Sequence, residues 1–159
     1  MNFTAQTREF LRNQRTFFLF KGEECPRDSR FPGDLSAKIQ IRPASIRTVE
    51  GNEIRLQAEV ENNSSSIWLP RSSGVGAVHL GCHVLDSSGK VLRHSYHWEA
   101  VSPGDGVPVM PNQKVKFGVT LPPLPSGSYI LEFDMVSNDV AWFAQNGSRT
   151  FRVLLEVSQ

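Results

Sequence analysis

Apolar and polar residues alternate along most of the chain after Ser36. An alternation with a period of two gives each segment one apolar face, which predicts half-buried β-strands rather than helices. In residues 53–61, for example, every second residue is apolar and the residues between are charged or polar. Runs of this kind cover residues 38–42, 53–61, 78–84, 114–121, 129–135 and 151–157, with a further short run at 90–98.

Turn-forming residues separate these runs. Residues 86–89, Asp-Ser-Ser-Gly, predict a short hairpin loop, while 103–106 and 122–127 predict longer crossings. Seven to eight short strands in about 120 residues predict an all-β fold, an immunoglobulin-like antiparallel β-sandwich. Tyr129 stands near the start of the penultimate strand, where a tyrosine corner ties the preceding crossover back to the chain.

The apolar faces of the strands should meet in one core between two sheets. The expected core residues are Ile54, Leu56, Val60, Leu80, Cys82, Phe117, Leu131, Phe133 and Val153. Cys82 should therefore point inward and stay reduced. The only other cysteine, Cys25, lies in a polar segment, and two cysteines are too few for a disulfide-stapled secreted domain.

Residues 1–20 are the only good helix candidate. Helix formers dominate this segment, and its large apolar residues, most of them aromatic, recur at spacings near three, four and seven: Phe3, Phe10, Leu11, Phe17 and Phe18. We expect an N-terminal α-helix and a linker over residues 1–35, followed by the sandwich over residues 36–159. The aromatic stripe should be covered by its own domain, by a partner chain or by a second copy in a homo-oligomer.

The charge balance excludes one large class of partners. With 17 basic and 16 acidic residues the formal charge is +1, whereas nucleic-acid binding requires a basic surplus.

No apolar run approaches the roughly 20 residues of a membrane span. Arginines interrupt residues 1–20, so this segment does not resemble a signal peptide. We expect a cytoplasmic protein with no membrane span.

The sequence offers little for catalysis or for metal binding. His79 and His83 are four apart on a strand, about 13 Å between Cα atoms, and we expect them on a polar sheet face. Glu132 and Asp134 share a strand face but are expected to be solvated there. Nucleophile, phosphate-binding and metalloprotease motifs are absent from the sequence. We therefore expect no enzymatic activity, no metal and no cofactor.

The tryptophans suggest a binding surface instead. Trp68 and Trp142 are expected to be structural, because tryptophan in sandwiches usually fills the core or an open end. Trp98 closes a polar run, and an exposed ring beside polar side chains can stack on a sugar ring. The candidate ligand-binding residues are Arg93, His94, Tyr96, His97, Trp98 and Glu99.

The order of motifs along the chain resembles a known group of domains. The resemblance lies in Asn62-Asn63-Ser64 before Trp68, in Val78-His79-Leu80-Gly81, in the run from Pro125 to Val136, and in Val140-Ala141-Trp142-Phe143. Residues 36–157 look like the immunoglobulin-like accessory domains of bacterial glycosyltransferases and methyltransferases of surface-polysaccharide synthesis. They are more distantly similar to the carbohydrate-binding domains of O-antigen ABC transporters.

This resemblance implies a sandwich without catalysis of its own that acts in polysaccharide synthesis or export. Its partners would be a glycan, a lipid-linked glycan or a polysaccharide-biosynthesis enzyme. The chain departs from the usual arrangement, because the aromatic segment 1–20 stands where those proteins carry an enzyme domain. The alternative function is a protein-interaction or assembly module that docks a partner, or a second copy, through this segment.

Overall fold

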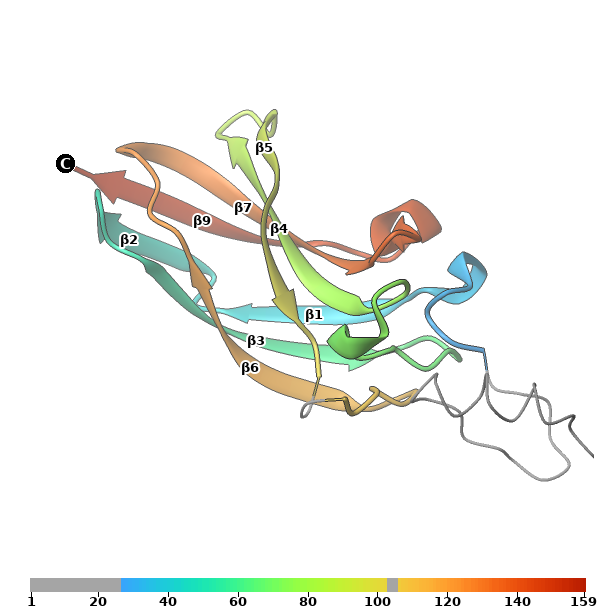
Figure 1. Cartoon of the computed structure of the whole chain (residues 1–159). Coiled ribbons are helices and arrows are strands. Elements are labelled where there is room, and N and C mark those ends of the chain that lie inside the picture. The colour runs from blue at the N-terminus through green and yellow to red at the C-terminus, as the bar shows by residue number, and fades with distance from the viewer. Residues whose placement is uncertain (1–26, 103–105) are drawn as a thin grey trace, which may run out of the picture.

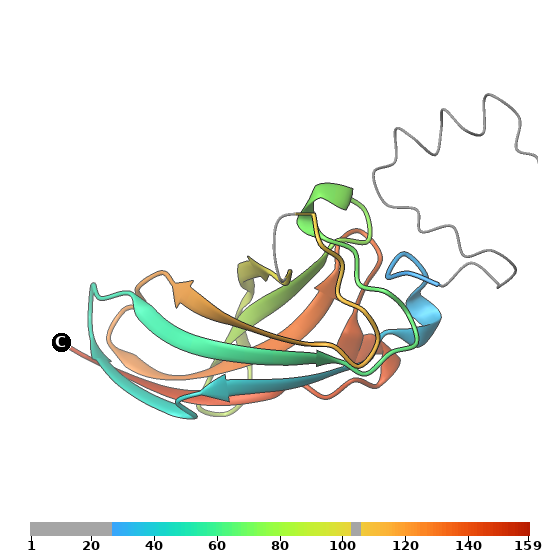
Figure 2. The same cartoon turned by 90° about the horizontal axis from the view of Figure 1, so that it is seen from below.

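The computed structural model describes residues 27–102 and 106–159, which fold into two sheets packed face to face (Figures 1 and 2). These residues form nine strands: β1 (Ala37–Arg42), β2 (Ser45–Val49), β3 (Ile54–Asn62), β4 (Val78–Asp86), β5 (Val91–Ala100), β6 (Lys114–Leu121), β7 (Gly127–Ser137), β8 (Ala141–Trp142) and β9 (Phe151–Ser158). The chain is therefore an all-β sandwich. The expected helix over residues 1–20 lies outside the described residues.

The strands divide between a smaller and a larger sheet. The smaller sheet has the order β1-β3-β6, and the larger has the order β2-β9-β7-β4-β5, with β8 added to β7. Neighbours are antiparallel except β2 and β9, which are parallel. The chain crosses repeatedly between the sheets, in the manner of an immunoglobulin-like topology.

The strand count exceeds the seven to eight expected from the sequence. The first predicted strand ends at Arg42, and the peptide bond from Arg42 to Pro43 is cis. After Pro43 the chain leaves the smaller sheet and forms a separate strand, β2, in the larger sheet. β2 is mostly exposed, with only Ile46 and Thr48 half-buried, so its apolar alternation is weak. β8 has two residues, too few for any period to be visible.

The core lies between the sheets and follows the predicted apolar faces. Eight of the nine expected core residues are buried, and Phe117 is partly buried against the same cluster. Trp68 is fully buried and packs edge-on against Phe143, with ring centroids 5.5 Å apart. The predicted structural role of Trp68 is thereby confirmed.

Two further predictions about the core are confirmed. The hydroxyl of Tyr129 donates a hydrogen bond to the carbonyl oxygen of Pro125, 3.0 Å away, as a tyrosine corner requires. Cys82 is a free thiol that points into the core. Burial raises its pKa to about 12, so the thiol remains protonated and unreactive.

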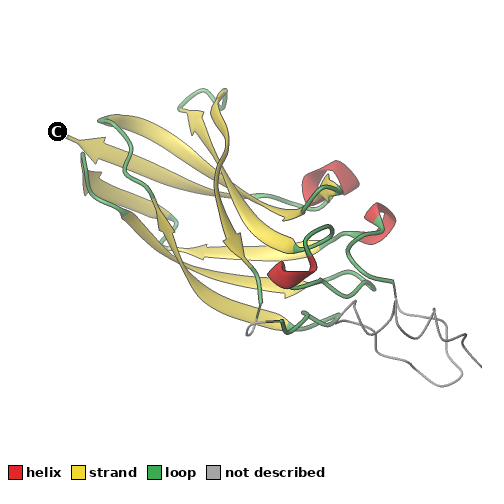
Figure 3. Cartoon of the chain, viewed as in Figure 1, coloured by secondary structure: helices red, strands yellow, loops and turns green. Residues whose placement is uncertain are grey.

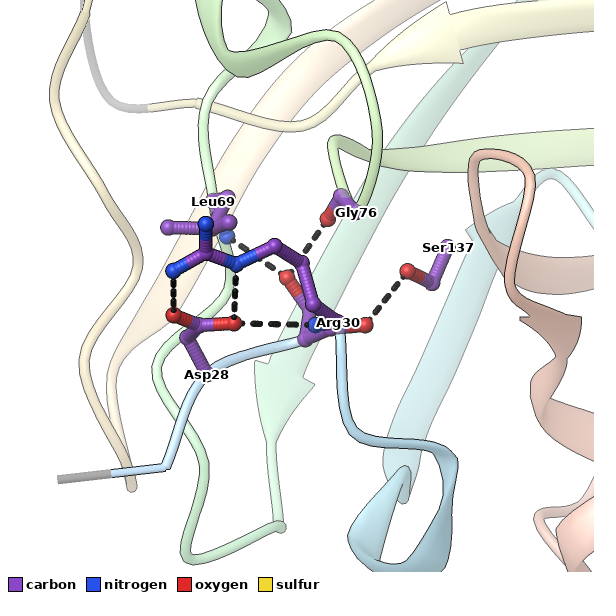
Figure 4. A network of polar contacts seen from close by, with 6 residues as sticks. Asp28, Arg30, Leu69, Gly76 and Ser137 are labelled. Atoms are coloured by element: carbon purple, nitrogen blue, oxygen red, sulfur yellow. Dashed lines mark hydrogen bonds and ion pairs between the residues drawn. The ribbon is translucent and has the colours of Figure 1, made fainter. Parts of the chain in front are cut away.

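The segment 27–35 packs against one end of the sandwich. Ser29 is buried there, and its hydroxyl donates to the carbonyl oxygen of Gly76 at 2.5 Å and accepts from the amide of Leu69 at 2.9 Å (Figure 4). Ser137 of β7 donates to the carbonyl oxygen of Ser29 at 2.6 Å. These bonds tie residues 27–30 to the β3–β4 connection and to β7.

Three short 3₁₀ turns, η1 (Pro32–Asp34), η2 (Arg71–Ser73) and η3 (Phe143–Asn146), lie at the end of the sandwich opposite the C-terminus (Figure 3). None of the helices among the described residues has the length and hydropathy of a membrane-spanning helix.

Candidate functional site

The outer face of the larger sheet carries polar and aromatic side chains where β4, β5 and β7 run side by side. Along β4 the core residues Leu80, Cys82 and Val84 alternate with outward-facing residues, because successive side chains of a strand point to opposite faces. His79, Gly81 and His83 consequently share the outer face.

Five rings gather on this face, and we call them the outer ring cluster. They are His79 and His83 of β4, His94 and Trp98 of β5, and Trp142 of β8. Ring centroids lie 4.3 Å apart for His83 and His94, and 4.5 Å apart for His83 and Trp142. Trp142 also meets Trp98 at 5.7 Å, with ring planes nearly perpendicular. His79 closes the row, 5.7 Å from Trp98.

Gly81 makes room for the cluster. A Cβ atom at this position would lie 2.5 Å from the Cζ3 and Cη2 atoms of Trp142, closer than non-bonded atoms can approach. The absence of a side chain at Gly81 therefore lets the indole of Trp142 lie against the backbone of β4. β8 brings Trp142 there by pairing with the end of β7, where Trp142 is opposite Val136.

His83 is buried rather than exposed on a polar sheet face, with 7% of its surface accessible. Trp142 and His94 cover it, and the sequence pattern could not reveal this cover. The Nδ1 atom of His83 accepts a hydrogen bond from the backbone amide of Ser95, 3.0 Å away. Burial, and to a lesser degree His94, lowers the pKa of His83, so its ring is neutral and carries its proton on Nε2.

His79 is only half-buried and holds the opposite tautomer. Its Nδ1 lies 3.2 Å from the carbonyl oxygen of Ala77, and a carbonyl oxygen can only accept. Nδ1 therefore carries the proton of the neutral ring. Burial lowers the pKa of His79 as well.

Asp134 of β7 lies next to the cluster, opposite Gly81 in the strand register. The expectation that Asp134 is solvated is wrong, since only 2% of its surface is accessible. One carboxylate oxygen accepts from the amide of Ala144 at 3.2 Å, and the other has no partner among the described residues. Burial raises the pKa of Asp134 to about 6.

Glu132, which shares this face, is also less solvated than expected. Its carboxylate accepts from Arg152 at 2.8 Å and from Thr150 at 3.3 Å. The side chain of Glu132 retains 17% of its accessible surface. Both carboxylates are therefore held by neighbouring segments, Glu132 by Arg152 of β9 and Asp134 by the amide of Ala144 in η3.

The six predicted binding residues divide between two faces of β5. Trp98 and His94 belong to the outer ring cluster, where both contact Trp142, and Trp98 is 38% exposed. The register places Arg93 opposite Val84, His97 opposite Cys82 and Glu99 opposite Leu80, all of them core residues. Because directly opposed residues share a face, these three side chains lie on the inner side of the sheet edge.

The inner group makes contacts of its own. The hydroxyl of Tyr96 donates to the carbonyl oxygen of Pro122 at 2.7 Å, in the connection between β6 and β7. The guanidinium of Arg93 lies over the Tyr96 ring, 5.6 Å from its centroid. His97 Nε2 is 3.3 Å from the carboxylate of Glu99. The structure thus does not bring these four residues together with Trp98 on one surface.

A bulge in β5 helps to set this division. Ser95 has a positive φ of 53°, and the register between β4 and β5 shifts between Cys82 and Val84. Such a bulge re-aims the neighbouring side chains of a strand. No sequence pattern marks it, because serine is not a residue that favours positive φ.

Sequence reasoning placed His79 and His83 on the outer face of the sheet, as observed, but did not count them or Trp142 among the binding residues. Their spacing about Gly81 places both histidines on one face of a strand, next to the face of Trp98. Nothing in the sequence indicated that Trp142 folds back over Gly81. The arrangement can stack a flat apolar ligand face on Trp98 and offer ring nitrogens to polar groups beside it. No cluster of metal-ligating side chains is found in residues 27–102 and 106–159.

Comparisons with known proteins find only distant structural likenesses. No protein-family model matches the chain, and no curated protein matches it. Among solved structures, the CARDB domain of the PF1109 protein from Pyrococcus furiosus, in complex with di-metal ions, has a TM-score of 0.45 at 10% identity, covering 88% of this chain and 99% of that domain.

Two further structures show likeness of the same order. The C-terminal domain of wzt has a TM-score of 0.45 at 16% identity and covers 84% of this chain and 83% of that one. A PapD-like domain of human CEP192 has a TM-score of 0.34 at 20% identity, covering 89% and 93%. With TM-scores below 0.5 and identities of 20% or less, these likenesses carry no conclusion about what this chain binds.

Proposed function

We propose that the chain is a non-catalytic carbohydrate-binding module that holds a sugar ring on Trp98, acting in the synthesis or export of a bacterial surface polysaccharide. The observation that carries the binding proposal is the outer ring cluster, with an exposed indole at its margin and polar ring nitrogens beside it. The bacterial polysaccharide context rests on the motif resemblance of residues 36–157.

The chemistry of the surface favours a sugar over other ligands. The apolar face of a pyranose can stack on an indole, while its hydroxyls need hydrogen-bond partners at the rim of the ring. His79 and His94 supply such groups next to Trp98 and Trp142. A single shallow platform repays little of the ordering cost of binding, so we expect dissociation constants on the order of 10⁻⁵ to 10⁻³ M.

Replacing Trp98 by alanine tests the proposal. Isothermal titration of the wild type with hexasaccharides of glucose, mannose, galactose and N-acetylglucosamine, and with an array of bacterial surface polysaccharides, should identify a bound sugar. Trp98→Ala should abolish that binding and shift the Tm by no more than about 4 °C, the equivalent of about 1 kcal/mol in a domain of this size.

Leu92→Ala is the matched control. Leu92 lies on the same edge strand and is 51% exposed, but it is not part of the outer ring cluster, so its truncation should leave sugar binding intact. Unfolding of the Trp98→Ala protein would show that the ring belongs to the core. A wild-type protein that binds none of the sugars would contradict the proposed function and favour the assembly module.

A further inference from the structure

His79 stands at one end of the outer ring cluster, half-buried, and one of its ring nitrogens already has a hydrogen-bond partner. Its Nδ1–H is used by the carbonyl oxygen of Ala77. The Nε2 atom of the same neutral ring is therefore a lone-pair acceptor and cannot donate. The ring centroid of His79 lies 5.7 Å from that of Trp98, so this acceptor lies beside the proposed stacking platform.

The acceptor is available to a ligand. Nε2 of His79 has no hydrogen-bond partner among the described residues, and it is not one of the polar atoms that they seal from solvent. Burial lowers the pKa of the ring, with Arg71 acting in the same direction and the Ala77 bond and Glu99 opposing it. The ring is therefore neutral at pH 7, and the lone pair is free.

We propose that Nε2 of His79 accepts a hydrogen bond from a hydroxyl group of an uncharged pyranose stacked on Trp98. This inference rests on the proposed function and adds the ligand's chemistry: the sugar must present a donor at the rim of its stacked face. A uronic acid that placed its carboxylate here would set oxygen lone pairs against the lone pair of Nε2.

The neighbouring histidine supplies a contrast within the same cluster. Nδ1 of His83 accepts from the amide of Ser95, so its remaining nitrogen carries a proton and can only donate. His83 is buried beneath Trp142 and His94, whereas His79 is half-buried at the margin of the cluster. Of these two β4 histidines, His79 is therefore the one placed to meet a ligand hydroxyl.

The variant His79→Phe keeps an aromatic ring beside Trp98 and removes the acceptor. Isothermal titration with the hexasaccharide that the wild type binds best should show affinity weakened about tenfold, the effect of one lost hydrogen bond. The control His97→Phe changes a histidine on the opposite face of β5 and should leave the affinity within about twofold.

Monodeoxy analogues of the same sugar separate a direct contact from a structural effect. The analogue that lacks the donor hydroxyl should bind the wild-type protein about tenfold more weakly than the parent sugar does. The His79→Phe protein should bind this analogue and the parent sugar with equal affinity. Equal sensitivity of both proteins to every analogue would overturn the assignment of His79.

Long-range proton–nitrogen NMR of the free protein tests the acceptor without any sugar. Nδ1 of His79 should show the chemical shift of a protonated nitrogen and Nε2 that of an unprotonated one. The reverse tautomer would overturn the inference while leaving the proposed function standing. A wild-type protein that binds no sugar overturns both, and a His79→Phe variant that binds like the wild type overturns the inference alone.

Discussion

Asp134 faces outward from β7 in the strand register, yet only 2% of its surface is accessible. One oxygen holds the amide of Ala144 at the start of η3, and the other has no partner among the described residues. Because a buried carboxylate lacks the solvation of water, the protonated form is favoured and the pKa rises to about 6 from its ordinary value of 3.8.

This shift predicts a particular dependence of stability on pH. Between about pH 4 and 6 the folded state holds a proton that the unfolded chain has released, so the free energy of unfolding falls as pH rises. Asp134→Asn should remove that dependence and stabilise the protein at pH 7 by about 1–3 kcal/mol. Urea unfolding at several pH values between about 4 and 7 measures both effects.

Asp139→Asn is the control, since Asp139 is exposed and its positive φ of 56° is compatible with asparagine. It should leave the pH profile unchanged. If Asp134→Asn unfolds at the same urea concentration as the wild type at every pH, then the carboxyl of Asp134 is hydrated in solution.

The face of the sheet on which each residue lies could be predicted from the sequence, but the burial of residues on the outer face could not. Period-two alternation decides which side of a strand each residue takes, and it correctly placed Cys82 and Phe133 in the core. It does not decide whether the outer side is covered. His83 and Asp134 are buried because β8 and η3, which follow β7 in the chain, return to this region of the sheet.

At the scale of elements, the outer ring cluster depends on the fit between β4 and β8. Trp142 occupies the space above Gly81, where any Cβ atom would overlap it. The strands β4 and β7 themselves pair over nine residue positions without interruption, from Val78 opposite Ser137 to Asp86 opposite Tyr129. A change at Gly81 should therefore displace the two-residue strand β8 and leave β4 and β7 paired.

Gly81→Ala tests this dependence. The methyl group should force the indole of Trp142 from its position, at a cost of about 1–3 kcal/mol in the free energy of unfolding. Tryptophan fluorescence and near-UV circular dichroism should change with it. Gly118→Ala, in β6, is the matched control, because the atom nearest its Cβ would be 3.8 Å away. Unchanged spectra for Gly81→Ala would show that Trp142 does not pack there.

The sequence was less informative about how elements connect than about which elements exist. Each long alternating run became a strand, and Tyr129 marked the crossing into β7 correctly. The switch of the chain between sheets at Pro43, the bulge at Ser95 and the strand β8 were not foreseen. These features arise from contacts between distant segments, whereas periodicity reports only on neighbours along the chain.

At the scale of the whole molecule, the segment 27–35 connects parts of the sandwich that are far apart in sequence. The backbone amide of Ser29 donates to the carbonyl oxygen of Ile67 at 2.9 Å, and its side chain and carbonyl oxygen bind Leu69, Gly76 and Ser137. Leu35 is fully buried in the core. The segment therefore contributes both polar and apolar contacts to the fold.

These contacts place the start of the folded unit before residue 36, the boundary expected from the sequence. A chain that begins at residue 36 loses the burial of Leu35, for which about 2–5 kcal/mol is typical, and the hydrogen bonds of Ser29, each worth about 1 kcal/mol. It should therefore unfold at a clearly lower urea concentration than a chain that begins at residue 27. Ser29→Ala should reproduce part of the loss, whereas Phe31→Ala, at a side chain that is 58% exposed, should not. Equal stability of the two truncated chains would instead make residues 27–35 a linker, and the sandwich would then begin at β1.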